Sequence, residues 1–303
     1  MADRGPAPAA LGTVPLRVPV RRIGLRTFDF SRQVAVMAIV NRTPDSFFDQ
    51  GRTFALDSAV AAAVAAAGQG ADWVDVGGVP FKPGPELSAA DEVDRVLPVV
   101  EALVAESDVV VSVDTFRPEV AAAAIRAGAS VVNDTTALHD PRLADVVADS
   151  EATLVVTHSL APPRTAWPHP RYDDVAREVV ELLSRRVDLA LARGVPEERI
   201  VVDPGHDLNK ATVHTLELTR RLGEVAALGF PVLAAVSNKD FIGEMLDREK
   251  PDRLAGTLAA ATACVLLGAR VVRMHDVPSA VDAVRMVEGI LGWRAPLLAR
   301  HDV

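Results

Sequence analysis

Short apolar runs alternate along the chain with longer amphipathic segments that are rich in Ala and Leu. Each apolar run is nearly continuous, a pattern typical of parallel strands that are covered on both faces. The segments between the runs have helical periodicity, and several end in Gly just before the next run, as helix C-termini often do. We therefore predict eight strands, at residues 34–41, 71–78, 108–115, 130–135, 152–159, 199–205, 231–238 and 269–276.

Eight strand–helix units in 303 residues predict an α/β fold of the (β/α)8 type, a TIM barrel. A doubly wound open sheet is the alternative. Residues 14–30, before the first predicted strand, alternate enough to form a short N-terminal β-hairpin that closes the bottom of the barrel. Residues 1–13 are rich in Ala and Pro and are expected to form a disordered tail. Residues 14–303 are then a single domain.

Composition narrows the class of protein. Hydrophobic residues make up 49% of the chain and aromatic residues only 4%, so the core must consist mainly of Ala, Val and Leu. The net charge of −9 argues against a nucleic-acid-binding surface but not against a small anionic ligand. Cys264 is the single cysteine; it lies in an apolar helical run and is expected to be a packed hydrophobic residue.

The chain has no uninterrupted apolar stretch of the ~20 residues that span a membrane. The N-terminus also lacks the apolar region of a signal peptide. We therefore expect a cytoplasmic protein that does not bind membranes.

Polar residues follow nearly every predicted strand. In a (β/α)8 barrel these positions meet at one rim, where active sites are built. Asp and Asn are also common turn residues, and an ordinary turn or structural role is favoured for Asp75 and His158 taken singly. For the set as a whole we favour a binding site. Its members are Asn41, Asp75, Asp114, Thr115, Asn133, Asp134, His158, Asp203, Ser237, Lys239, Arg273 and His275.

Two kinds of chemistry can be separated within this set. Asp114, Asn133 and Asp203 offer hydrogen-bond acceptors, which suit a flat heterocycle rich in N–H donors. A second group suits phosphate oxygens; it comprises Asn41, Lys82, Arg273 and His275. A heterocycle with a phosphorylated arm would satisfy both. A phosphorylated leaving group usually brings Mg²⁺, for which Asn41 offers one oxygen ligand.

No Walker loop, dinucleotide fingerprint, H-E-x-x-H motif or serine nucleophile elbow is present in the sequence. Two stretches rich in Pro or Gly, 77–84 (GGVPFKPG) and 160–172 (LAPPRTAWPHPRY), are expected to be loops over the same face as the polar rim.

Several of these stretches resemble the dihydropteroate synthase family. Residues 37–51 (MAIVNRTPDSFFDQG) are similar to its first-loop motif N-V-T-P-D-S-F, and residues 77–84 correspond to its second loop, G-G-E-S-T-R-P-G. The later strand ends follow in the family's order, and the resemblance runs from about residue 34 to about residue 287. These later stretches are SVDTF, VNDTT, DPGHDLNK, VSNKDFIGEML and VVRMHD.

The resemblance implies a (β/α)8 barrel, usually a homodimer. It also implies a transferase that joins 6-hydroxymethyl-7,8-dihydropterin diphosphate to p-aminobenzoate and releases diphosphate with Mg²⁺. By resemblance Asn41, Arg273 and His275 contact the diphosphate, with Asn41 also at the metal. Asp114, Asp203 and Lys239 are the catalytic residues, and the two carboxylates stabilise a pterin cation. The implied pterin contacts are Asp114, Asn133, Asp203 and Lys239.

The departures from the family pattern concern the second substrate. The second loop has Val79, Pro80, Phe81 and Lys82 where the family has E-S-T-R, and lysine cannot make arginine's bidentate fork. Leu208 replaces an aromatic residue expected against the aminobenzoate ring. Elsewhere Asn238 and Asp240 replace the Arg and the last Ser of S-R-K-S, and Arg42 replaces a small apolar residue in the first loop.

Asp240 is the change with the largest expected effect. Two like charges ~4 Å apart repel by ~4 kcal/mol at an effective dielectric constant near 20. If solvent screening halves this repulsion, the remaining ~2 kcal/mol still lowers the affinity for the substrate carboxylate more than tenfold. Asn238 stands where a cation could have offset the charge. Alternatively, Asp240 is only an exposed N-cap of the following helix.

Our hypothesis is that pterin diphosphate binding with Mg²⁺ survives while p-aminobenzoate condensation is weak or lost. In this pattern the chain resembles most the divergent second-copy paralogues, which are similar to dihydropteroate synthase without replacing it and are expected to be inactive. Two alternatives stay open: an active synthase of folate biosynthesis with a rearranged p-aminobenzoate pocket, or a transferase that uses an uncharged or cationic acceptor.

Overall fold

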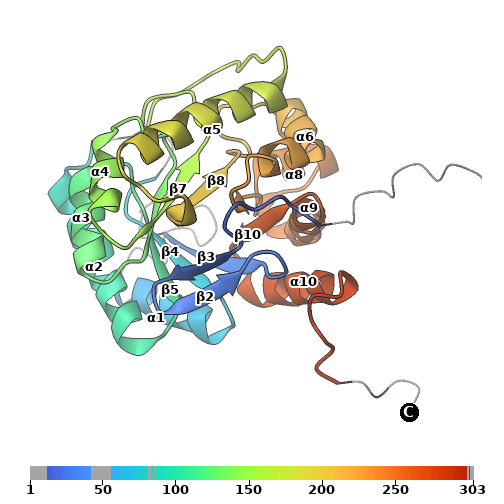
Figure 1. Cartoon of the computed structure of the whole chain (residues 1–303), viewed down its shortest axis with the longest axis horizontal. Coiled ribbons are helices and arrows are strands. Elements are labelled where there is room, and N and C mark those ends of the chain that lie inside the picture. Colours follow the sequence, from blue (N-terminus) through green and yellow to red (C-terminus); the bar gives the residue numbers. More distant parts are fainter. Residues whose placement is uncertain (1–11, 42–55, 81–82, 85, 299, 301–303) are drawn as a thin grey trace, which may run out of the picture.

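Eight parallel strands close into a barrel in the order β10-β3-β4-β5-β6-β7-β8-β9 (Figure 1). The computed structural model describes residues 12–41, 56–80, 83–84, 86–298 and 300. The predicted (β/α)8 barrel is therefore confirmed, and each predicted strand contains an observed one. The barrel strands are β3 (Ala35–Asn41), β4 (Trp73–Gly77), β5 (Val110–Asp114), β6 (Val131–Asp134), β7 (Thr153–Thr157), β8 (Ile200–Asp203), β9 (Val232–Ala234) and β10 (Ala269–Met274).

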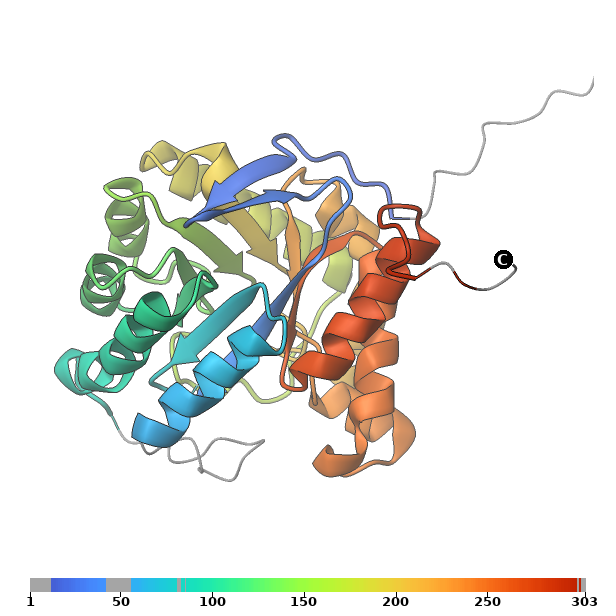
Figure 2. The same cartoon turned by 90° about the horizontal axis from the view of Figure 1, so that it is seen from below.

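Helices surround the barrel as an outer ring (Figures 1 and 2). Their apolar stripes face the sheet, as expected for amphipathic helices on a parallel sheet. The described helices are α1 (Leu56–Gly68), α2 (Ala89–Glu106), α3 (Pro118–Arg126), α4 (Arg142–Ala148), α5 (Val175–Ala192), α6 (Thr212–Arg220), α7 (Leu222–Ala226), α8 (Asp240–Leu246), α9 (Leu254–Leu266) and α10 (Val277–Ile290).

Alternate residues of each strand face opposite sides of the barrel wall. In β3, Val36 and Ala38 belong to the large core between strands and helices, whereas Ala35 and Met37 belong to a second core inside the barrel. Both sets are completely or almost completely buried. This explains why the strands appear in the sequence as continuous apolar runs and not as alternating ones.

On several strands the inner face changes from apolar to polar along the strand. Trp73 of β4 lies in the inner core, and Asp75 follows two residues later on the same face. Val271 of β10 is likewise in the inner core and is followed by Arg273. Apart from Thr153 at the start of β7, the barrel therefore has a mainly apolar interior where its strands begin and a layer of polar side chains where they end.

A two-stranded hairpin, β1 (Val20–Ile23) and β2 (Arg26–Asp29), covers the end at which the barrel strands begin (Figure 2). Its Phe28 packs against Phe30 and meets Trp73 edge to face, with ring centroids 6.0 Å apart in the second pair. Gly24 in the turn has a φ of 58°, a conformation that glycine adopts without strain. The predicted hairpin that closes the barrel is thus confirmed.

Buried arginines tie the N-terminal segment to the barrel. Arg270 donates hydrogen bonds to the carbonyl oxygens of Phe30 and Gly12, and Arg21 donates to that of Ile200. The amide of Gly12 donates to the Leu266 carbonyl. Residues 1–11 of the expected tail lie outside the described residues, so for them the tail stays a prediction.

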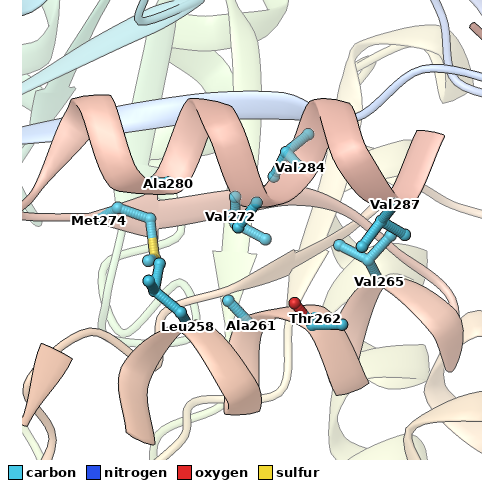
Figure 3. A pocket seen from close by; sticks show the side chains of 10 residues that line it. Leu258, Ala261, Thr262, Val265, Val272, Met274, Ala280, Val284 and Val287 are labelled. Atoms are coloured by element: carbon cyan, nitrogen blue, oxygen red, sulfur yellow. The ribbon is translucent and has the colours of Figure 1, made fainter. Parts of the chain in front are cut away.

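A small gap separates α9 from α10, between Leu258, Val265 and Val284 (Figure 3). Its volume of about 10 Å³ holds at most one water molecule, so we assign it to helix packing. Cys264 of α9 is fully buried, and burial raises the pKa of its thiol to about 12. No helix in the described part of the chain has the length and apolarity to cross a membrane.

Candidate functional site

Asp75 is the centre of the polar layer at the carboxyl rim. It accepts hydrogen bonds from Ser112 Oγ at 2.6 Å, Asn133 Nδ2 at 3.0 Å and Arg273 Nε at 2.7 Å. The residue has no exposed surface. The sequence favoured an ordinary turn residue at this position; the structure corrects this, because Asp75 lies within β4 and its carboxylate links side chains from β5, β6 and β10.

Arg273 bridges two carboxylates. Its Nη2 lies 3.0 Å from Asp114 Oδ2, while its Nε is on Asp75. Burial and the nearby charge of Asp75 raise the pKa of Asp114 to about 7, and Arg273 opposes this shift. Asp114 is thus held where a bound cation or N–H donor can shift it to the ionised form.

Asn133 presents one unsatisfied atom to the barrel interior. Its Nδ2 is used by Asp75, and its Oδ1 is buried with no hydrogen-bond partner among the described residues. The residue is 1% exposed. A buried acceptor without a donor costs about 1–3 kcal/mol, so this atom suits a ligand N–H group.

Asp203 and Lys239 continue the layer. Asp203 accepts a hydrogen bond from the Gly205 amide at 2.7 Å, and burial raises the pKa of its carboxyl group to about 6. Burial lowers the pKa of the Lys239 ammonium, and the nearby carboxylates of Asp207 and Asp203 oppose the shift. One carboxylate, Asp203, and one cation, Lys239, therefore stand on the β8 and β9 side of the rim.

The residues expected at a phosphate come from β3 and β10. His275 follows β10, and its Nδ1 and backbone amide both contact Ser237 Oγ, at 2.9 and 3.1 Å. Asn41 ends β3 beside Gly77. A methyl group built on Gly77 would lie 2.9 Å from Asn41 Oδ1 and 3.9 Å from Asp114 Oδ2. Arg42 and residues 43–46 of the first loop, with Phe81 and Lys82 of the second, lie outside the described residues.

Asp240 is not the uncompensated charge that the sequence suggested. Its carboxylate lies 3.0 Å from Arg253 Nη1, and its side chain is 75% exposed. Arg253 is itself buried and also donates to the carbonyl oxygens of Asn238 and Lys239. The N-cap of α8 is Lys239, so the alternative that Asp240 caps this helix is wrong.

The group that does occupy the N-terminus of α8 is Asp207. Its Oδ2 accepts the Phe241 amide at 3.1 Å, and its Oδ1 accepts the Thr215 hydroxyl at 3.0 Å. Burial raises the pKa of the Asp207 carboxyl group, and Lys239 opposes this. A carboxylate of the protein thus already fills a helix end that would attract a substrate carboxylate.

Leu208 and Lys210 lie in the same loop after β8. The Lys210 ammonium contacts the Gly205 carbonyl at 2.9 Å, the Leu208 carbonyl at 3.1 Å and His158 Nδ1 at 2.9 Å. Burial lowers the pKa of Lys210 to about 7. His158 is fully buried, so the structural role favoured from sequence agrees with its position.

Sequence reasoning missed Asp207, Lys210 and Arg253. The first two lie within DPGHDLNK. Two charged residues directly after a buried strand could have marked them as candidates for the site. No local pattern in the sequence marks Arg253, because it approaches Asp240 only through the packing of α8 against α9.

Among the described residues, no three His, Cys, Asp or Glu side chains form a cluster that could hold a metal ion. Mg²⁺ prefers oxygen ligands and retains several waters when it accompanies phosphates. The oxygens of Asn41 and Asp114 on either side of Gly77 fit that type of site.

Comparison with known proteins agrees with this geometry. A model of the pterin binding enzyme family matches residues 37–275. The chain is 43% identical over 267 residues to inactive dihydropteroate synthase 2 of Mycobacterium leprae, covering 86% of this chain and 92% of that one. It is 37% identical over 279 residues to the dihydropteroate synthase of Synechocystis, covering 91% and 96%.

The fold matches that of solved synthases. The dihydropteroate synthase of Xanthomonas albilineans with 4-aminobenzoic acid superposes with a TM-score of 0.81 at 39% identity, covering 90% of this chain and 98% of that one. A second structure of that protein holds 7,8-dihydropteroate and gives a TM-score of 0.78 at 36% identity, with the same coverage. This chain therefore belongs to the pterin-binding enzyme family, among its dihydropteroate synthase-like members.

Proposed function

We propose that the protein binds 6-hydroxymethyl-7,8-dihydropterin diphosphate with Mg²⁺ and condenses p-aminobenzoate weakly or not at all. The observation that carries the pterin half is Asn133. Asp75 fixes its side chain through Nδ2, and its buried Oδ1 has no donor among the described residues. The several N–H groups of a flat aminated heterocycle would satisfy that oxygen and the carboxylates of Asp114 and Asp203.

The carboxylates define the chemistry of binding. Asp114 and Asp203 are ionised above pKa values of about 7 and about 6. As ionised acceptors they would pair with ring N–H groups and stabilise positive charge that develops when the C–O bond to diphosphate breaks. Lys239 would donate to an acceptor on the ring. Pterin affinity should therefore fall as the pH is lowered from 8 to 5.5.

Mg²⁺ would be held through Asn41 and the diphosphate, where it would neutralise charge on the leaving group. Arg273 and His275 would contact the same phosphate oxygens. Ser237, through its two contacts with His275, would orient that imidazole.

Two residues of the pocket expected for p-aminobenzoate support the loss of condensation. The Asp207 carboxylate accepts a hydrogen bond from the Phe241 amide at the start of α8. Leu208 follows it in the chain, in place of an aromatic residue. The Mycobacterium leprae relative described above carries the name of an inactive synthase. The homodimer and the cytoplasmic location stay predictions.

One observation favours an active synthase with a rearranged pocket. The Asp240–Arg253 pair has no net charge, so it repels a carboxylate far less than Asp240 alone. With Asp240 neutralised, the reason to expect an uncharged or cationic acceptor is also weaker.

Calorimetry with the pterin diphosphate and Mg²⁺, followed by a steady-state assay with p-aminobenzoate, tests the proposal. We expect binding without measurable turnover. Asn133→Leu should lower pterin affinity by about tenfold, the value of one buried hydrogen bond. Thr153→Val is the matched control, because Thr153 is also buried with an unpaired oxygen but lies at the opposite end of the barrel interior.

Turnover at a rate typical of synthases would establish the active alternative. Absence of pterin binding, or equal losses in the two variants, would contradict the assignment of the site.

A further inference from the structure

The loop between β7 and α5 is held in place at both ends. Asn209 Oδ1 accepts the amides of Leu160 at 2.8 Å and Ala161 at 3.2 Å. At the other end Tyr172 donates its hydroxyl to the Asn209 carbonyl at 2.9 Å. One residue of the loop after β8 therefore fixes both ends of residues 160–172 beside the carboxyl rim.

Arg164 is the unusual residue of this loop. Its φ of 57° is in the left-handed region, which a bulky side chain adopts at a cost of about 1–3 kcal/mol. Its Nε is buried without a partner among the described residues. Its guanidinium reaches the loop after β4, since a Cβ atom on Gly84 would lie 2.6 Å from Arg164 Nη2. Strain of this kind persists where the surrounding structure imposes it.

Arg164 lines a small recess that opens beside Asp114. The recess has a volume of about 20 Å³, which is room for one or two oxygen-sized atoms. It is formed by residues from the loops after β4, β5, β6 and β7, among them Val79, Asp114, Thr115, Thr135, Pro163 and Arg164.

Arg164 is the one cation lining the recess that has no partner in the described part of the chain. Both of its carboxylates have a cation: Glu92 pairs with Arg117 at 2.6 Å and Asp114 with Arg273 at 3.0 Å. Arg164 takes part in no ion pair or hydrogen bond with the rest of the described chain. An anionic group would therefore supply the missing partner of Arg164, and a guanidinium suits a carboxylate because it can donate two parallel hydrogen bonds.

We propose that Arg164 binds the carboxylate of the second ligand, on the β5–β7 side of the pterin. The proposal rests on the proposed function and names the residue that recognises the second substrate class, an aromatic amine with a carboxylate. It follows from two observations together: Asp207 fills the N-terminus of α8, and Arg164 offers an unpaired cation across the rim. Weak condensation is compatible with it, because a ligand held from this side need not present its amine to the pterin.

Calorimetry can test the assignment without turnover. The wild type, saturated with 6-hydroxymethyl-7,8-dihydropterin, Mg²⁺ and diphosphate, is titrated with p-aminobenzoate and with its uncharged analogue 4-aminobenzamide. We expect the acid to bind more tightly than the amide. Arg164→Ala should weaken the acid by about tenfold and leave the amide unchanged, and Arg164→Lys should restore part of the loss. Arg171→Ala, which removes an exposed cation from the same loop, should have no effect.

The outcomes separate the two proposals. If the wild type fails to bind the pterin, the proposed function is overturned and this inference with it. If the pterin binds but the acid does not, or if Arg164→Ala weakens acid and amide equally, only this inference is overturned. A loss of diphosphate affinity in Arg164→Ala with unchanged p-aminobenzoate affinity would assign Arg164 to the first substrate and also overturn it. Thermal unfolding of each variant checks that the fold is retained.

Discussion

The substitution Asp207→Gly should restore a carboxylate site at the N-terminus of α8. Asp207 holds the Phe241 amide at 3.1 Å, and its removal would free that donor. A hydrogen bond from this amide to a substrate carboxylate is worth about 1.5–3 kcal/mol. Removing a like charge at ~4 Å adds ~2 kcal/mol after screening. Allowing for partial overlap of the two terms, we expect p-aminobenzoate affinity to rise at least tenfold, about 1.4 kcal/mol.

The variant should still fold. The lost helix cap costs about 1 kcal/mol, and loss of the hydrogen bond from the Thr215 hydroxyl costs about 1 kcal/mol more. Asp207 has a φ of 61°, and a glycine there recovers about 1 kcal/mol of left-handed strain. Urea unfolding should therefore give a stability about 1 kcal/mol below that of the wild type.

The assay is calorimetry of p-aminobenzoate on the pterin-saturated protein, with Asp240→Ser as the comparison. Asp240 is mostly exposed and paired with Arg253 at 3.0 Å, so its replacement should change affinity by less than about threefold. The opposite ranking, a tenfold gain from Asp240→Ser and none from Asp207→Gly, would refute the reasoning. It would mean that charge near the helix, and not occupation of its amide, limits binding.

Three further predictions concern buried groups. Asp75→Asn should destabilise the protein by about 3–5 kcal/mol, because it breaks a buried ion pair with Arg273; urea unfolding against the exposed Asp188→Asn measures this, and equal stabilities would contradict it. The folded-state pKa of Lys210 is lowered to about 7, so the folded state holds fewer protons than the unfolded state from there to about 10.5. The stability of the wild type relative to Lys210→Met should therefore rise over that pH range, and a flat difference would refute the assignment. Cys264 should not react with a thiol reagent in the native protein at pH 8, because it is buried with a raised pKa; reaction before unfolding would contradict this packing.

The fold could be predicted almost completely from the sequence, because each barrel strand is covered on both faces and leaves an uninterrupted apolar run. The positions of the strand ends then followed from the topology, and they placed Asp114, Asn133, Asp203 and Arg273 at one rim. Strand periodicity could not decide whether Asp75 turns inward or begins a turn. That choice depends on the register of β4 with β5, in which Asp75 lies opposite Ser112.

For the p-aminobenzoate pocket, the sequence could show only which residues depart from the family pattern. We expected Asp240 to lower p-aminobenzoate affinity most, because it lies in the family motif itself. Its partner Arg253 is 13 residues away, and the contact between Asp207 and Phe241 spans 34 residues. Both are tertiary contacts that no local pattern reports, and together they move the expected obstacle from Asp240 to Asp207.

Closure of the barrel has a consequence for synthesis of the chain. Its seam joins β3 to β10, and the seam is reinforced by a hydrogen bond from the Val34 amide to Glu288 at 2.9 Å, across 254 residues. Until Ala269–Met274 has been translated, β3 and β9 each keep an unpaired edge, the kind of surface that recruits other strands. Contacts of such long sequence separation also slow folding. The nascent protein should therefore have a long window in which it is prone to aggregate, and its yield in cells should depend on chaperones more than the stability of the finished barrel would suggest.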